Sequence, residues 1–532
     1  MKKTIIISTL LLAAISWNAS AQALEEKHLN DYDYIQAARG WLTSQNSAGL
    51  GVLSVNGVSV AELRGNMVKG GFGNYSGSGD SFTGGAECRS YIRLDPKTVL
   101  YGLVSYDYFS GQKMGGSCFV DPYYNSVNVV EYSDTTAGHK LKETYHLVGG
   151  FSYNATNSFS FGVKVDYSAA DYAKTKDLRY VDDLMDLKFT AGFKYHTEPV
   201  DLGFNYYYRR RVELAEFEVK GTTDKDHYSL IDYGGLFGSW ELFGESGITS
   251  SSYKTPELAQ LQGGALQLEF HFGKNANFFN EFGLRYRKGY LGSSSSARVM
   301  YYEHSGVEAE YSGAFSLVSG HNVHSVVLKG LYTTLQNYQN IYNIVTDNTV
   351  TTVNYYGSNL VGDRITGNAS AEYIGNFNVK GNYPRIVVRA GADGYFRALR
   401  ASVYPNYRDQ NISSIDYHLA GTYNAIGFRN IISGTLGIGY GKGGGYASKD
   451  GVYENASAQP VAIRSTEFYL QREFEYFTAP KIRTNAAFRY TQFFGKGISV
   501  YADLSENFLY APKAVYLGKI ANVVALTLGC SF

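Results

Sequence analysis

Apolar and polar residues alternate one by one over long stretches of this chain. Residues 161–167, 185–195, 266–272, 282–287 and 498–505 each place apolar side chains at every second position, with polar, charged or small ones between them. A helix repeats every 3.6 residues, whereas successive side chains of a strand point to opposite faces. The pattern therefore predicts strands with one apolar and one polar face.

Strand length, aromatic placement and the pattern of connections favour a membrane barrel over a soluble β-sandwich, which also alternates. The alternating segments run for roughly ten to fourteen residues, longer than most soluble strands and suited to a tilted membrane strand. Tyrosine clusters such as 206–208 are expected near strand ends, where membrane barrels carry aromatic girdles. After residue 21 the sequence contains no run of 18 or more apolar residues, which excludes a membrane-spanning helix.

The connections between these segments alternate between short and long. Short turns are expected at 95–98, 198–199, 273–275, 320–322 and 381–383. Longer polar loops are expected near 69–83, 111–140, 215–260, 335–365 and 442–460. This asymmetry is typical of outer-membrane barrels, whose turns face the periplasm and whose loops face outward.

The N-terminus has the composition of a secretory signal peptide. Lys2 and Lys3 precede an apolar run, and Ala19-Ser20-Ala21 supplies the cleavage pattern, so residues 1–21 are expected to be removed. Residues 51–532 then form the barrel, with about 18 strands in a range of about 16 to 20. We predict an all-β fold, a transmembrane antiparallel up-and-down β-barrel that crosses the Gram-negative outer membrane many times.

The last segment, 521–532, also alternates and ends in an aromatic residue. Val524, Leu526 and Leu528 share one face with Cys530 and Phe532. A terminal amphipathic strand that ends in an aromatic resembles the insertion signal of outer-membrane barrels. This resemblance implies that the barrel assembly machinery reads Phe532, so this machinery and outer-membrane lipids are the expected partners.

Residues 22–50 differ from the alternating remainder, and a short helix is expected over 33–42. Asn46-Ser47-Ala48-Gly49-Leu50 resembles the Asn-Pro-Ala-Gly element of long-chain fatty-acid transporter barrels, with Ser47 in place of proline. In those barrels an N-terminal segment plugs the lumen. The resemblance implies a plug with four candidate residues, Trp41, Asn46, Gly49 and Leu50; a disordered periplasmic leader is the open alternative.

The opening Trp-x-x-Ser-x-Asn-x-Ala-Gly-Leu (41–50) and the tyrosine-rich strands also resemble an uncharacterised outer-membrane barrel family of Bacteroidota, known only as a domain of unknown function. This second resemblance covers nearly the whole mature chain. It implies a barrel fold and brings no activity with it.

If the apolar faces meet lipid, the polar faces line the lumen. The candidate lumen residues are Lys164, Asp166, Asp186, Lys188, Arg209, Arg211, Glu269, Arg285, Arg287, Arg389 and Asp393. Neither sign dominates, although four arginines among them are expected to form a local basic patch. A strongly selective pore would show rings of one sign, so paired charges that stiffen the barrel and a ligand track both remain open.

Overall charge and motifs exclude several functions. The 48 Lys and Arg balance the 48 Asp and Glu, which gives no electrostatic case for a nucleic-acid partner. Residues 439–444 satisfy G-x-G-x-x-G, but they are expected to lie where a strand ends and a loop begins, without the helix that a dinucleotide site needs.

No catalytic, metal or cofactor residues are assigned, and we predict that the protein is not an enzyme. A disulfide between Cys88 and Cys118 is an open alternative to two free thiols.

Three functions are compatible with these observations. The first is a permeation or transport channel for a small solute or amphiphile. The second is a barrel scaffold whose long outer loops bind a surface lipoprotein or a larger outer-membrane complex. The third is a barrel-embedded hydrolase, which would require a Ser/His/acid or metal cluster that only folding brings together.

Overall fold

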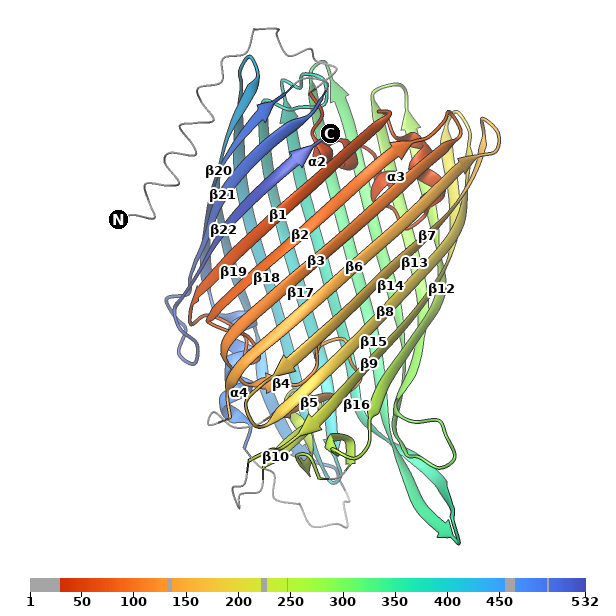
Figure 1. The fold of residues 1–532 in the computed structure, drawn as a ribbon, viewed down its shortest axis with the longest axis vertical. Coiled ribbons are helices and arrows are strands. Elements are labelled where there is room, and N and C mark those ends of the chain that lie inside the picture. Colours follow the sequence, from red (N-terminus) through yellow and green to blue (C-terminus); the bar gives the residue numbers. More distant parts are fainter. Residues whose placement is uncertain (1–28, 132–135, 222–226, 246, 455–464, 495–496) are drawn as a thin grey trace.

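The computed structural model describes residues 29–131, 136–221, 227–245, 247–454, 465–494 and 497–532. Within these residues, 18 antiparallel strands form one closed ring, which confirms the predicted fold class and strand number (Figure 1). Neighbouring strands follow one another along the chain, and β1 (Gly57–Gly70) pairs with β22 (Ile520–Ser531) to close the ring. Closure gives the backbone amides of every ring strand a partner on both sides. The predicted signal peptide, 1–21, lies outside the described residues.

Sixteen further strands complete the ring between β1 and β22 in the described part of the chain. They are β2 (Asp80–Arg93), β3 (Thr98–Met114), β6 (Gly138–Asn154), β7 (Phe159–Lys174), β8 (Arg179–His196), β9 (Val200–Glu218), β12 (Thr255–Phe272), β13 (Ala276–Gly292), β14 (Met300–Ser319), β15 (Asn322–Asp347), β16 (Val350–Phe377), β17 (Ile386–Val403), β18 (Asn406–Ile426), β19 (Asn430–Val452), β20 (Lys481–Phe493) and β21 (Ser499–Tyr510).

The period of two translates directly into an inner and an outer face. On β13, Phe282, Leu284 and Tyr286 are exposed on the outside, whereas Arg285 and Arg287 between them are buried on the inside. The same alternation runs along the other strands with strong sequence patterns. Apolar side chains therefore cover the outside of the ring and polar ones the lumen, as a membrane barrel requires.

The two ends of the barrel differ. All five short turns predicted from the sequence join consecutive strands at one end, called here the turn end, where the chain also enters β1 and leaves β22 (Figure 1). The longer connections emerge at the opposite end, called here the loop end. They include residues 511–519, which lie between β21 and β22 outside any strand.

Two predicted loops are strands instead. Residues 335–365 were expected to form a loop, but they are the distal parts of β15 and β16, which pair from Asp347↔Val350 back into the ring. Figure 1 shows this hairpin projecting beyond the loop end. The prediction at 442–460 is wrong up to Val452, because β19 continues to that residue, and the G-x-G-x-x-G run lies inside this strand.

The remaining elements lie at the two ends of the lumen. A second sheet in the order β11-β10-β5-β4 is built from β4 (Gly116–Ser117), β5 (Asn128–Glu131), β10 (Tyr228–Gly234) and β11 (Phe237–Leu242). Helix α4 (Glu467–Thr478) and the short turn η3 (Gly247–Thr249) accompany it at the loop end. The helices α2 (Tyr32–Ala37) and α3 (Gly40–Thr43) and the 3-10 turn η2 (Ser47–Val52) lie at the turn end. Among the described helices, none is long and apolar enough to cross a bilayer.

Candidate functional site

The segment before β1 lies inside the barrel at the turn end. The helix predicted over 33–42 appears as two short ones, α2 and α3, because the chain is extended at Arg39. The Asp31 carboxylate caps α2 by accepting the Tyr34 amide at 2.8 Å, and the Asn46 side chain caps η2 through the Ala48 amide at 3.1 Å. Both caps satisfy amides that a short helix leaves unpaired.

Trp41 and Asn46 anchor this segment to the barrel wall. The Trp41 indole is fully buried and donates to the Glu269 carboxylate at 2.8 Å, while its ring packs edge-on against Phe279. The fully buried Asn46 amide donates to Gln267 at 2.9 Å and to the Phe193 carbonyl at 3.0 Å. Loss of the Trp41–Glu269 bond would leave a buried indole N–H without a partner, which is costly.

Glycines on the wall make room for the segment. A Cβ atom at Gly162, Gly192 or Gly203 would lie within 2.6 Å of Ala48, Asn46 or Trp41 respectively. A Cβ atom at Gly49 would overlap the Trp41 ring at 2.3 Å. Leu50 joins a buried cluster with Val58 and Tyr91 from the first two strands. The predicted plug candidates therefore sit in a recess shaped by small residues.

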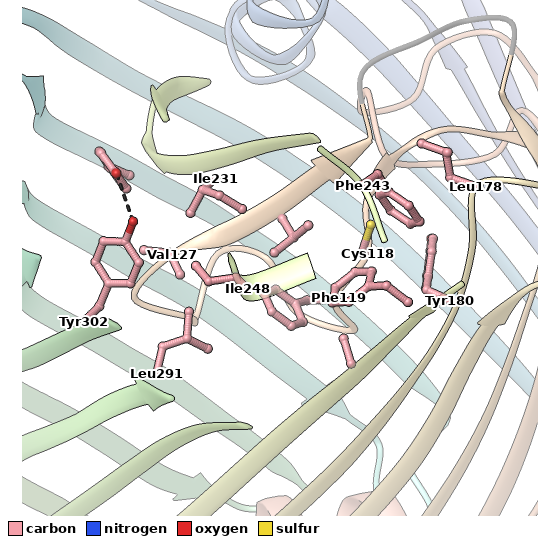
Figure 2. Packing of buried hydrophobic residues seen from close by; sticks show 14 of the residues in the cluster. Cys118, Phe119, Val127, Leu178, Tyr180, Ile231, Phe243, Ile248, Leu291 and Tyr302 are labelled. Carbon is pink, nitrogen blue, oxygen red and sulfur yellow. Dashed lines mark hydrogen bonds between the residues drawn. The ribbon is translucent and has the colours of Figure 1, made fainter. Parts of the chain in front are cut away.

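Connections at the loop end fold inward and cover the other opening. Cys118, Phe119 and Val127 from the β3–β6 connection pack with Ile231, Phe243 and Ile248 from the β9–β12 connection and with wall residues such as Tyr302 (Figure 2). From the β19–β20 connection, α4 contributes Glu473, which accepts from Arg397 on β17 at 2.8 Å. We call this assembly of the second sheet, the connection between β4 and β5 (residues 118–127), η3 and α4 the inner cap.

A buried ion triad fastens the inner cap to the wall. Glu131, at the end of β5, contacts the ammonium groups of Lys140 on β6, at 3.3 Å, and Lys174 on β7, and all three side chains are completely buried. Lys140 also donates to the carbonyls of Gly115 and Ser117 at 2.8 and 3.1 Å. Because two buried cations share one anion, each member depends on the others.

Two carboxyl groups of the inner cap are tuned by burial. Desolvation raises the pKa of Asp232 to about 6 and that of Glu241 to about 7, although each accepts backbone amides. Their folded pKa values lie above the ordinary ones, so they stabilise the cap most at acidic pH. This contribution is lost as the pH rises through about 6 to 7.

A chamber of about 490 Å³ remains between the N-terminal segment and the inner cap. Gln45 borders it on the turn side, and Asp121, Tyr123 and Tyr124 of the inner cap border it on the loop side. The wall residues come from β7, β8, β9 and β13 to β17; they are Lys164, Asp166, Lys188, Thr190, Tyr207, Arg209, Arg285, Glu308, Glu310, Leu331, Thr333, Thr366, Asn368 and Tyr395.

Four arginines meet two tyrosines at this chamber. The guanidinium carbons of Arg209, Arg211 and Arg287 lie 4.5, 4.4 and 4.2 Å from the centre of the Tyr124 ring. Arg285 stacks on Tyr207 at 4.1 Å. Such cation–π contacts are strongest where water is excluded.

The charges of these arginines are balanced locally. Arg209 forms a bidentate pair with Asp186 at 2.8 and 2.6 Å. Arg285 donates to the Glu310 carboxylate at 2.6 Å and to the side-chain oxygen Oε1 of Gln45 at 3.0 Å, and therefore ties the N-terminal segment to the wall. The chamber presents rigid, paired charges and aromatic rings rather than a single sign.

A second space leads past the N-terminal segment at the turn end. It measures about 220 Å³ and lies between Asp31, Asp33 and Tyr34 on one side and the wall from β15 to β21 on the other. Arg389 lines it. Further along β17, Asp393 lies 3.4 Å from His418 and is 59 % exposed to the lumen.

The eleven lumen residues chosen from the sequence all lie on inner faces, but they belong to different places. Lys164, Asp166, Lys188, Arg209 and Arg285 line the chamber. Three others contact residues that line the chamber: Asp186 pairs with Arg209, and Arg211 and Arg287 stack on the Tyr124 ring. Glu269 holds Trp41, and Arg389 and Asp393 lie on the opposite wall.

Several chamber residues were missed by sequence reasoning. Tyr207, Glu308, Glu310 and Thr333 occupy inward positions that the alternation could have revealed. Residues 206–208 were instead expected near a strand end, and the structure places them in the interior of β9. Asp121, Tyr123 and Tyr124 come from a long connection, and no periodic signal marks them.

The Cys88–Cys118 disulfide is excluded by the structure. Both thiols are free, Cys88 being exposed and Cys118 fully buried. Cys88 shares the outward face of β2 with Phe82 and Ile92, whereas Cys118 packs in the inner cap. The barrel wall therefore separates the two sulfur atoms.

The fold and the chamber define a class: a closed 18-strand barrel in which the chain itself fills both ends of the lumen. Residues 47–532 match the family described as "Family of unknown function (DUF6850)", and the chain belongs to this family. No curated protein matches it. Membership fits the predicted family of unknown function, while an origin in Bacteroidota stays a prediction.

The solved structures to which the chain is similar include two receptors and a transporter. BauA, the ferric preacinetobactin receptor from Acinetobacter baumannii, shares 8% identity over 90% of this chain and 80% of that one, with a TM-score of 0.40. The ferripyoverdine receptor of the outer membrane of Pseudomonas aeruginosa shares 12% sequence identity over 90% of this chain and 72% of that chain, with a TM-score of 0.38. The Pseudomonas putida toluene transporter TodX shares 11% sequence identity over 96% of this chain and 99% of that chain, with a TM-score of 0.30.

Proposed function

We propose that this protein is a gated permeation barrel of the bacterial outer membrane, with its turn end in the periplasm and its loop end outside. The observation that carries the proposal is the chamber of about 490 Å³ between two inserted segments. A barrel of about 18 strands is too wide for its own wall residues to fill. Here the chain fills both ends and leaves the centre free.

The chamber indicates the kind of solute. Its volume falls within the range of pockets for small organic ligands, about 300–1,000 Å³. Tyr124, Tyr207 and Tyr395 offer aromatic faces, and the paired charges offer donors and acceptors of both signs. This combination suits a small neutral or zwitterionic amphiphile better than a simple ion, because a selective ion pore needs a field of one sign.

A cysteine in the chamber tests whether it lies on the pathway. Thr333 lines the chamber, whereas its neighbour Tyr332 is 42% exposed on the outer face. Treatment of Thr333→Cys with a charged methanethiosulfonate reagent is expected to reduce bilayer conductance by about half or more, because a bulky cation then occupies the narrow polar space.

The matched control is Tyr332→Cys, which should keep its conductance under the same reagent. Wild-type protein serves as a second control, because Cys118 is fully buried and both Cys88 and Cys530, the cross-strand partner of the exposed Val500, lie on the outer face. Normal conductance in the fully modified Thr333→Cys barrel would show that solutes do not pass through the chamber.

A second candidate function is a scaffold that binds a surface lipoprotein or another outer-membrane protein. The projecting hairpin favours it. Ring pairing ends at Gln339 on β15 and at Gly362 on β16, and beyond these residues the two strands pair with each other. Ile344, Val350 and Tyr356 on this hairpin are 51, 65 and 68% exposed. Apolar side chains gathered on a projecting element are typical of a protein-binding surface.

Trimming the hairpin tests the scaffold function. Replacement of residues 342–356 by an Asn-Gly turn should preserve the ring, since Ile341 and Gly357 are already paired. Cross-linking and pull-down from native membranes should recover a partner with the wild-type barrel and lose it with the trimmed one. Recovery of the wild-type barrel alone at every cross-linker dose would count against a scaffold.

A further inference from the structure

Two histidines and a buried aspartate meet at the turn end, outside the chamber. His196 ends β8, its cross-strand partner Asp201 is the second residue of β9, and His271 lies near the end of β12. Their ligand atoms all lie within 4.8 Å of one another. Asp201 Oδ1 contacts His196 Nδ1 and lies 3.3 Å from His271 Nε2.

We propose that His196, Asp201 and His271 form a binding site for a divalent transition-metal ion of the zinc type. Two imidazole nitrogens and one carboxylate oxygen are ligands that zinc accepts, and three protein ligands leave a fourth position for water. With metal–ligand bonds of about 2.0–2.2 Å, neighbouring ligand atoms of a tetrahedral site lie roughly 3.3 Å apart. Asp201 Oδ1 and His271 Nε2 already lie at this spacing, 3.3 Å apart.

The surroundings of Asp201 support this role. Its side chain is only 3% exposed, and its second oxygen, Oδ2, accepts from Lys194 at 2.7 Å. Oδ1 is then fixed toward the two imidazoles, as a hydrogen-bonded metal-binding carboxylate requires. The cluster lines a hollow of about 660 Å³ that also includes Arg39 and Glu269, which gives an ion an access path.

Asn277 links the site to the N-terminal segment. With its carbonyl toward His271, the Asn277 side chain accepts from Nδ1 at 3.1 Å, which frees Nε2 for a metal. The reversed orientation satisfies more partners, because its amide donates to Nδ1 and its carbonyl accepts from Arg39 at 2.8 Å, so metal binding requires this amide to turn over. Metal binding through Nε2 and the Arg39–Asn277 bond therefore exclude each other.

Metal titration of the purified barrel tests the site. Full-length protein without a histidine tag is stripped with chelator and titrated with Zn²⁺ by calorimetry, and with Co²⁺ by its visible absorption. One ion per chain is expected. His196→Ala, His271→Ala and Asp201→Asn should each weaken binding about 10-fold or more, and Asn277→Asp should tighten it, because a carboxylate stabilises the Nδ1–H tautomer.

His324→Ala is the matched control, because His324 also lies near the turn end but pairs with Tyr373 at 2.8 Å. It should bind the ion like the wild type. Heat-modifiable migration on gels checks that each variant is a folded barrel. If the wild type binds no ion, or if the three ligand variants bind as tightly as the wild type, the cluster is only an ion-pair network around Asp201. Neither result depends on whether the barrel conducts.

Discussion

Deletion of residues 22–50 is expected to raise the single-channel conductance of the barrel about twofold, because the N-terminal segment and the inner cap act as resistances in series. The described part of this segment places Trp41 and Asn46 in the lumen, with both side chains fully buried against the wall. Its removal exchanges packed protein for water at the turn end. Planar-bilayer recordings at fixed salt measure the change.

Two further variants make this test specific. Trp41→Ala keeps the chain length but costs about 3–5 kcal/mol of packing, so it should give transient openings rather than a permanent one. The barrel with residues 342–356 replaced by Asn-Gly changes an element outside the lumen and should conduct like the wild type. Unchanged conductance in the folded deletion variant would refute the plug.

Glu131→Ala is expected to release the inner cap. The substitution leaves Lys140 and Lys174 buried without their anion, a loss that costs about 3–5 kcal/mol in buried ion networks. Hydrogen exchange of residues 115–131 should therefore accelerate by about 10²–10⁴-fold, because local opening becomes easier by the same free energy. Combined with the deletion of 22–50, conductance should rise far more than either change achieves alone.

The control for Glu131→Ala is Asp80→Ala. Asp80 pairs with Lys69 at 2.5 Å, but the two side chains are 56 and 66% exposed. Exposed pairs of this kind contribute little, about 0–1 kcal/mol, so exchange of 115–131 should stay unchanged. The same slow exchange in a folded Glu131→Ala barrel would mean that apolar packing alone holds the cap.

The alternation of side chains made the ring predictable. This alternation depends only on each strand having one polar face toward the lumen and one apolar face toward lipid, and it can be read from the residues of each strand alone. Applied to residues 82–92, the same reasoning would also have placed Cys88 with Phe82 and Ile92 on the outside and excluded the disulfide. The hairpin at 335–365 was missed although valine, threonine and tyrosine favour strands, because its polar residues resemble those of a loop.

The contents of the lumen could not be predicted in the same way. Trp41 and Glu269 are 228 positions apart in the sequence. Arg287 donates to the Tyr124 backbone carbonyl at 2.9 Å, although the two residues are 163 positions apart. No local rule relates such residues, because each contact exists only after the ring has brought distant strands together. The His196–Asp201 pair is intermediate: the predicted turn at 198–199 makes the two residues neighbours, whereas His271 joins them only through the next strand of the ring.

The pairing of β1 with β22, which closes the ring, can form only after the whole chain has been synthesised. Ser59 and Phe532 exchange two backbone hydrogen bonds at 2.8 and 3.0 Å, so the earliest strand of the ring receives its second partner from the latest one. A ribosome adding about 5–20 residues per second needs roughly half a minute to a minute and a half to cover that interval. Until then residues 57–70 have no β22 to pair with, so the unfolded chain has to be kept from pairing with other copies before the ring can close.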